Sequence, residues 1–153
     1  MTHNMLDAVE VLLSRHRQTT RILSDLARTE EAEDKASLLW GLASHMGIYM
    51  AVQEAHFYPC IRHRKTKTLV DDALDRHATI KDLLAELLSL ECDDITFEPR
   101  LRTLREKIES DLREEAGRLF PAVRRVFSED VLVALGHVIV AQAAFPEERS
   151  QLN

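Results

Sequence analysis

The stretch RHRQTTRILSDL, residues 15–26, is followed 61 positions later by RHATIKDLLAEL, residues 76–87. Each stretch opens with an Arg-His pair and continues with apolar residues three or four apart, the spacing of one face of an α-helix. His16 and His77 lie on that apolar face. The repeat therefore predicts two similar helices, each of which points an imidazole toward a shared interior.

A second pair of similar segments alternates with the first pair along the chain. YMAVQEAHFYP covers residues 49–59, and DLREEAGRLFP covers residues 111–121. Both segments end in an aromatic residue followed by proline. Asp111 and Glu115 lie four residues apart, so both can reach one point from a single helix face. Four helices that aim polar, metal-capable side chains inward predict a site inside a helical bundle.

Length and composition favour a single helical domain. With 153 residues we expect one domain over 1–153, with its core at about 5–143. Only four Gly, four Pro and 5% aromatic residues favour an all-α protein. A formal charge of -6 argues against binding to nucleic acid or to an anionic membrane surface.

The sequence also carries expectations about location and cysteine chemistry. No apolar run approaches the ~20 residues that span a bilayer, and the N-terminus lacks the pattern of a secretory signal. We therefore expect a cytoplasmic protein that does not associate with membranes. Cys60 and Cys92 fit no CxxC motif, and we expect no disulfide between them.

Apolar periodicity predicts five helices, at about 4–28, 34–64, 68–91, 98–126 and 129–144. Pro59 is expected to kink or loosen the end of the second helix. Thr68 and Asp71 resemble a capping box at the start of the third helix, and Ser128 is expected to cap the fifth. Short links between long helices favour an up-down-up-down four-helix bundle, with the short C-terminal helix packed across one end.

Polar residues occupy several inward positions near the middle of these helices. They are His16, His45, Tyr49, His56, His77, Asp111 and Glu115. Burying the two carboxylates without partners would cost several kcal/mol each. A cation is one suitable partner, and imidazole with carboxylate suits iron, manganese or zinc. Ion pairs with Arg15, Arg76 or Arg118 would form a metal-free alternative.

These residues resemble the hemerythrin-like, HHE cation-binding domain family over about 5–143. That family has a histidine in an L-x-x-H-x-x-apolar pattern in its first helix and repeats it in the third, where this chain has His16 and His77. Its second and fourth helices carry H-x-x-x-E and an aromatic-proline pair, with the proline ten residues after the histidine. Tyr58-Pro59 and Phe120-Pro121 match those pairs.

The resemblance implies a bundle that holds two non-haem irons, bridged by carboxylates and oxygen. Members bind dioxygen or nitric oxide, sense oxygen or iron, or react with peroxide. Counting back ten from each proline puts Tyr49 and Asp111 at the family's His positions, and Gln53 and Glu115 at its Glu positions. The resemblance thus keeps Glu115 as a ligand and makes Asp111 a changed but competent one. Tyr49 could bind ferric iron as phenolate, whereas Gln53 is a weak neutral donor.

Two hypotheses follow from the sequence. In the first, the chain is a variant non-haem protein with one or two iron ions, zinc and manganese being the other candidate metals. Its ligands would be His16, His77, Asp111 and Glu115, joined by Tyr49 or Gln53 and with His45 or His56 as substitutes. It would bind or react with a small diatomic molecule or peroxide, or sense redox state, and it could be a homodimer. In the second, the bundle binds no metal and serves as a structural or protein-interaction module.

Overall fold

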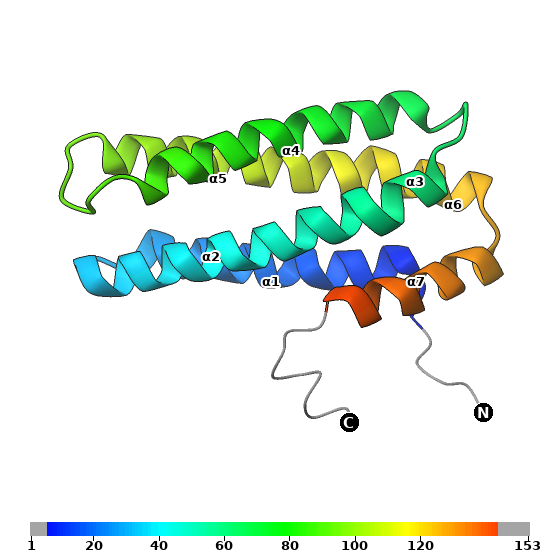
Figure 1. Ribbon diagram of the computed structural model, residues 1–153, viewed down its shortest axis with the longest axis horizontal. Coiled ribbons are helices and arrows are strands. Elements are labelled where there is room, and N and C mark those ends of the chain that lie inside the picture. The colour runs from blue at the N-terminus through cyan, green and yellow to red at the C-terminus, as the bar shows by residue number, and fades with distance from the viewer. Residues whose placement is uncertain (1–5, 144–153) are drawn as a thin grey trace.

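The computed structural model describes residues 6–143 as a bundle of long helices arranged in two layers (Figure 1). α1 (Ala8–Arg28) and α2 (Ala32–Val52) form one antiparallel pair, and α4 (Lys67–Leu88) and α5 (Phe97–Glu114) form the other. The short links after α1 and after α4 lie at the same end of the bundle. The predicted all-α, up-down-up-down bundle is confirmed. Residues 4 and 5 of the first predicted helix, and residue 144 of the last, lie outside the described part.

The second and fourth long helices each pass through one π-helical turn before a short final helix. In the second, the π turn Gln53–Phe57 connects α2 to α3 (Tyr58–Ile61). In the fourth, the π turn Glu115–Leu119 connects α5 to α6 (Phe120–Val126). Each short helix has its proline in the first turn, and this proline has no backbone N–H to bond to the preceding turn. The loosening predicted at Pro59 therefore takes the form of a π turn ahead of it.

The C-terminal helix α7 (Glu129–Ala143) packs alongside α1 and also contacts α2 and the first π turn (Figure 1). The Ser128 hydroxyl accepts a hydrogen bond from the backbone N–H of Val131 (3.3 Å), as the predicted cap requires. At Gly136 the two backbones are so close that a Cβ atom would lie 2.5 Å from the Leu6 carbonyl oxygen. The C-terminal helix thus lies along the side of the bundle near the start of α1. The prediction that it packs across one end of the bundle is wrong.

The starts of α1 and α4 are held in different ways. Asp7 and Glu10 form a capping box at α1, and the Arg124 guanidinium donates a 2.7 Å hydrogen bond to the Asp7 carboxylate. α4 begins after Thr66, whose hydroxyl donates to the carbonyl of Ile61 (2.6 Å). The capping box predicted at Thr68 is therefore wrong, because α4 already begins at Lys67 with Thr66 as its N-cap, and Thr68 lies inside the helix.

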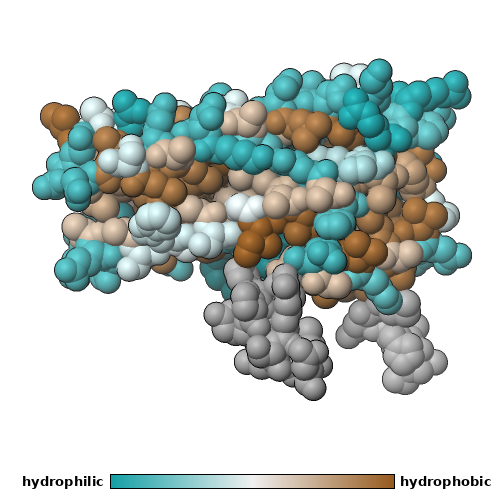
Figure 2. Space-filling view, in the orientation of Figure 1, coloured by the Kyte–Doolittle hydropathy of each residue, from teal (hydrophilic) through white to brown (hydrophobic). Residues whose placement is uncertain are grey.

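The core runs the length of the bundle and is filled mainly by aliphatic side chains. Phe57, Phe97 and Phe120 are its largest fully buried members, and each such burial contributes about 1.5–3 kcal/mol. On the face shown in Figure 2, hydrophilic colour gathers over α4, whereas α2 and α7 carry paler and more hydrophobic surface. Cys60 and Cys92 are free thiols, as expected. Within residues 6–143 no helix combines the length and apolarity needed to cross a bilayer.

Candidate metal centre

Every long helix contributes a polar side chain to one buried cluster near the middle of the bundle. Its members are His16 from α1, Tyr49 from α2, Gln53 and Glu115 from the π turns, His77 from α4 and Asp111 from α5. Candidate ligand atoms of His77, Asp111 and Glu115 all lie within 4.8 Å of one another. The two sequence repeats are thus brought to one level of the bundle.

Glu115 has the most hydrogen bonds in the cluster. Its Oε1 accepts from the Tyr49 hydroxyl (3.1 Å), and its Oε2 accepts from Gln53 Nε2 (2.5 Å) and from the Tyr58 hydroxyl (3.2 Å). His16 Nε2 lies 3.5 Å from Oε1, within ion-pair range. Burial by itself would raise the pKa of Glu115, but His16, the charge of His77 and the hydrogen bond from Gln53 hold that pKa below its usual value. The Glu115 carboxyl is therefore ionised at neutral pH.

Asp111 has a different environment, although it is equally buried. Its Oδ1 accepts a 2.8 Å hydrogen bond from Arg76 Nε, and its Oδ2 lies 3.9 Å from His77 Nε2. Burial, followed by the negative charge of Glu115, raises the pKa of Asp111 to about 6. Of the three arginines considered from the sequence, only Arg76 pairs with a cluster carboxylate in the described part of the chain.

His77 is oriented by a carboxylate on its outer side. Its Nδ1 lies 2.9 Å from Glu54 Oε2, and Glu54 Oε1 accepts from Lys81 Nζ (2.9 Å). A carboxylate beside Nδ1 accepts a hydrogen bond from it, so Nε2 keeps its lone pair and faces Asp111. The Tyr58 hydroxyl lies 3.2 Å from the same Nε2. Metal-binding histidines commonly have such a partner on their second nitrogen.

Among residues 6–143, three buried atoms of the cluster have no hydrogen-bond partner: His16 Nε2, Gln53 Oε1 and Asp111 Oδ2. Buried polar atoms are nearly always paired, so three in one cluster call for an explanation. An imidazole nitrogen, an amide oxygen and a carboxylate oxygen can each donate a lone pair to a cation. The residues present therefore fit a metal ion.

The remaining residues suggested by the sequence lie around this cluster. The His45 Nε2 lies 2.7 Å from the Thr19 hydroxyl, and burial followed by the charge of Arg15 lowers the pKa of His45. His56 is half-buried on the first π turn, and no hydrogen bond or ion pair joins it to the cluster within residues 6–143. Burial and the charge of Glu115 raise the pKa of Tyr49 well above its usual value, so Tyr49 is a neutral donor in the metal-free protein.

Tyr58 belongs to this cluster, although sequence reasoning assigned it no role there. The π turn bonds the Tyr58 backbone N–H to the Gln53 carbonyl, five residues back, and so stacks Tyr58 one turn above Gln53. In an uninterrupted α-helix the inward position after Gln53 would be Phe57 or His56. The available signal was Pro59, because a proline marks a place where helical register can change. In the other repeat the matching residue is Phe120, whose ring centroid lies 5.5 Å from that of His16.

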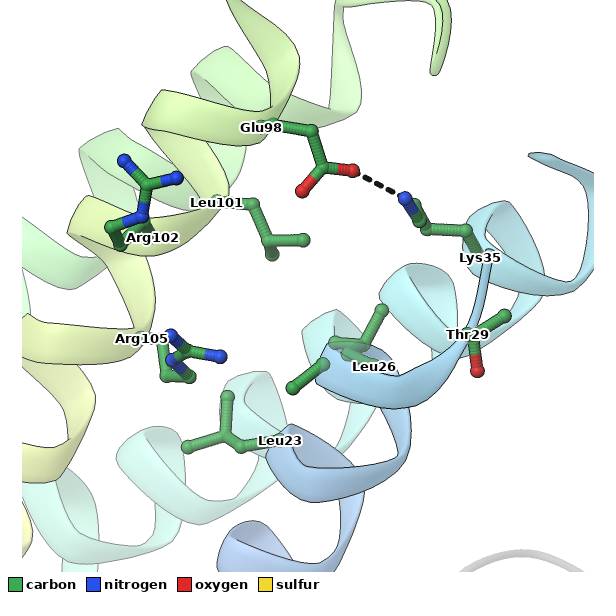
Figure 3. Close-up of a pocket in the computed structure, with 9 residues that line it drawn as sticks. Leu23, Leu26, Thr29, Lys35, Glu98, Leu101, Arg102 and Arg105 are labelled. Carbon is green, nitrogen blue, oxygen red and sulfur yellow. Dashed lines mark hydrogen bonds and ion pairs between the residues drawn. The ribbon is translucent and has the colours of Figure 1, made fainter. Parts of the chain in front are cut away.

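Two surface cavities differ in their relation to the cluster. One, of about 200 Å³, lies on the seam of α4 and α5 and is lined by Asp75, Arg76, Thr79, Lys107 and Ser110. The other, of about 130 Å³, lies between α1 and the start of α5 (Figure 3). Leucines line its interior and a Lys35–Glu98 ion pair lies at its edge. None of its lining residues belongs to the cluster.

Comparisons with known proteins agree with this architecture. The sequence model of the hemerythrin HHE cation-binding domain matches residues 7–123, a range that contains the whole cluster. A crystal structure of a hemerythrin HHE cation-binding domain-containing protein from Mycobacterium kansasii is similar, with a TM-score of 0.83. The two sequences are 20% identical over 95% of this chain and 89% of the other, so this likeness supports the fold alone. A search of curated proteins found no match.

Proposed function

Because the chain belongs to the hemerythrin HHE cation-binding domain family, we propose that it binds a non-haem iron ion at its buried cluster. The proposed ligands are His16, His77, Asp111 and Glu115. The observation that supports this proposal best is the set of unpartnered atoms, because His16 Nε2 and Asp111 Oδ2 are buried near Glu115 and form no hydrogen bond within residues 6–143. A cation would satisfy both atoms at once.

We propose one ion for each chain. Two imidazoles and two carboxylates form a set that suits iron, manganese or zinc. A second ion would depend on the side of the cluster formed by Tyr49 and Gln53, neither of which carries a negative charge in the metal-free protein. Because the segment 49–59 offers uncharged Tyr49 and Gln53 where the segment 111–121 offers Asp111 and Glu115, we expect a single ion on the side of Asp111 and His77.

Iron held here would supply a redox centre able to bind or react with dioxygen, nitric oxide or peroxide. The carboxylate-rich ligand set favours the ferric state, so peroxide handling or redox sensing fits better than reversible oxygen carriage. Tyr49 and Tyr58 both have pKa values raised by burial and by the charge of Glu115. Both hydroxyls therefore stay protonated and can donate hydrogen bonds within the site, while the surrounding core excludes bulk water.

Metal loading of purified protein tests this proposal. Under anaerobic conditions, we expect the chain to take up about one ferrous ion and to melt at a higher temperature, an effect that a chelator reverses. His77→Gln and Asp111→Asn should each weaken iron binding at least about tenfold. His45→Gln is the matched control, since it changes a buried histidine bonded to Thr19, and it should bind iron like the wild type. Substoichiometric iron, manganese and zinc, with a melting temperature indifferent to chelator, would contradict the proposal.

One specific observation favours the metal-free alternative. Glu115 already accepts hydrogen bonds from Tyr49, Gln53 and Tyr58, and Asp111 is paired with Arg76. Both carboxylates therefore have partners without a cation, and the bundle could serve as a structural or interaction module. In that case Asp111→Asn would change the free energy of unfolding of the metal-free protein while wild type and variant both fail to take up metal.

A further inference from the structure

The buried cluster needs a route by which a small ion can reach it. His77, Asp111 and Glu115 are all 0% exposed. The cavity on the seam of α4 and α5 is lined by Arg76 and Ser110, the sequence neighbours of His77 and Asp111. This cavity therefore lies beside the helical turns of α4 and α5 that carry that pair of proposed ligands.

Arg76 is the side chain that connects this cavity to the cluster. Its side chain is 23% exposed and lines the cavity, yet its Nε donates to Asp111 Oδ1 at 2.8 Å. One flexible side chain thus has its outer surface in solvent and its donor on a fully buried carboxylate.

We propose that the cavity on the α4–α5 seam is the access port of the buried site and that Arg76 is its gate. The guanidinium pairs with Asp111 while no cation is bound and swings into the cavity when one arrives. The nature of the arriving ion rests on the proposed function, whereas the gating rests on the Arg76 geometry alone.

The geometry of the Arg76–Asp111 contact allows such an exchange. Arg76 Nε donates to Oδ1, and Oδ2 has no hydrogen-bond partner in the described part of the chain, so an arriving cation can bind Oδ2 before the guanidinium leaves Oδ1. Two positive groups on one buried carboxylate repel each other strongly, and the mobile one is the arginine. Asp75, on the cavity wall, offers a negative charge near the place where the guanidinium would move.

A second approach to the cluster, from the α1 side, is less suitable. His16 lines a shallow cavity of about 460 Å³ together with Arg17, Thr20, Arg21 and Ser24. All five residues belong to α1, so this hollow is the outer face of one helix and not a gap between two. Arg76 could also have another role, that of orienting Asp111 for the metal. That role predicts weaker metal binding when Arg76 is removed, the opposite of a gate.

The rate of ferrous iron uptake under anaerobic conditions separates these possibilities. Arg76→Gln should speed uptake at least about tenfold, because access no longer requires breaking a hydrogen bond between charged groups. Lys107→Gln removes the same charge from the same cavity but leaves the gate, so its uptake should stay close to the wild-type rate. Arg17→Gln, on the α1 hollow, should behave like the wild type. Equal acceleration by Arg76→Gln and Lys107→Gln, or slower and weaker uptake by Arg76→Gln, would overturn the gate.

A metal-free measurement keeps the gate and the proposed function apart. The exchange of the His77 ring C2 hydrogen with deuterated water, followed by mass spectrometry over a pH series, reports access to the cluster without any metal. Arg76→Gln should raise the plateau exchange rate of His77 several-fold and leave that of His45 unchanged, whereas Lys107→Gln should alter neither. An unchanged His77 rate in Arg76→Gln would refute the gate. If His77 exchanges faster in Arg76→Gln but neither the wild type nor any variant takes up iron, the access port is supported and the iron site is refuted.

Discussion

Glu54 lies outside the buried cluster but fixes the orientation of one of its members. The Glu54 carboxylate contacts His77 Nδ1 and Lys81 Nζ at 2.9 Å each. Partial burial by itself would raise the pKa of Glu54, but the hydrogen bonds with Lys81 and His77 outweigh it and lower that pKa. Glu54 is therefore an anion at neutral pH, and it selects the His77 tautomer whose Nε2 is free to bind a cation.

Replacing Glu54 by glutamine tests this role. Glu54→Gln should weaken iron binding by about tenfold to a hundredfold, because the His77 ring loses the carboxylate that orients it. Equilibrium dialysis against ferrous iron measures the change. Glu86→Gln is the matched control, since it removes a carboxylate paired with Arg100 on the exposed surface. Identical affinities for the Glu54→Gln and Glu86→Gln proteins would show that Glu54 does not position His77.

Residues whose Cβ atoms lie on the predicted apolar faces could be placed from the sequence. A residue that starts beside such a face and reaches the cluster with a long side chain could not. His16, His77, Asp111 and Glu115 have side chains that project directly inward, so helical periodicity brings them to one level. Arg76 reaches Asp111 with a long side chain that starts beside that face. Periodicity describes where a Cβ atom points, and it left Arg76 as one of three candidate partners.

At the scale of the helices, the π turns explain what the periodicity of the sequence missed. Each turn adds one residue to a helical repeat, so the side chains beyond it are rotated relative to an unbroken α-helix. Tyr58 enters the cluster for this reason, whereas His56, expected inward, is half-buried and makes no hydrogen bond or ion pair with the cluster among residues 6–143. Pro59 was expected to loosen the second helix, whereas the fourth helix was predicted to run unbroken past Pro121, and neither proline specified a π turn.

The contact between α7 and the start of α1 depends on the absence of a side chain at Gly136. Gly136→Ala should lower the free energy of unfolding by about 1–3 kcal/mol, because its Cβ would overlap the backbone of residues 6–8. Gly47→Ala is the control: Gly47 is also helical, and no atom of the described residues lies within 4 Å of a Cβ there. That variant should gain about 0.5–1 kcal/mol. Urea unfolding measures both, and equal stability changes would show that α7 packs less closely than described.

At the scale of the whole molecule, the order and direction of the four long helices could be predicted, but the position of α7 could not. The long helices α1, α4 and α5 each have an apolar face and a charged face, so the sequence of each helix indicates which side is buried. Residues 131–143 contain no charged residue, and such a helix does not reveal which of its faces meets the bundle. The close approach at Gly136 decides it, and that approach depends on tertiary structure.

The pairing of Asp7 with Arg124 joins the start of α1 to α6, and it should make stability depend on pH. Burial opposes ionisation of Asp7, but the hydrogen bonds from Arg124 and from the Glu10 backbone outweigh it and hold the Asp7 pKa below its ordinary value of 3.8. A lowered carboxyl pKa stabilises the folded state above that value, and the stabilisation is lost as the pH falls through the folded-state pKa.

Asp7→Asn isolates the charge, because asparagine is also a good helix cap. At pH 7 the variant should be less stable by about 1 kcal/mol, a modest value because Arg124 is partly exposed. The difference should shrink as the pH is lowered from 7 to 3, since Asp7 then becomes protonated in the wild type as well. Denaturant unfolding across this range measures it. A difference that stays constant with pH would assign the effect to packing instead of charge.

The paired π turns also limit which changes in length the chain can accept. Gln53 and Glu115 are 62 positions apart, as are Pro59 and Pro121, so both halves carry the same extra residue at the same place. Deleting one residue from a single π turn would rotate Tyr58 or Phe120 away from the cluster while the other half stayed in register. Insertions and deletions should therefore be tolerated in the largely exposed link at 89–96, and be rejected between Gln53 and Pro59 and between Glu115 and Pro121.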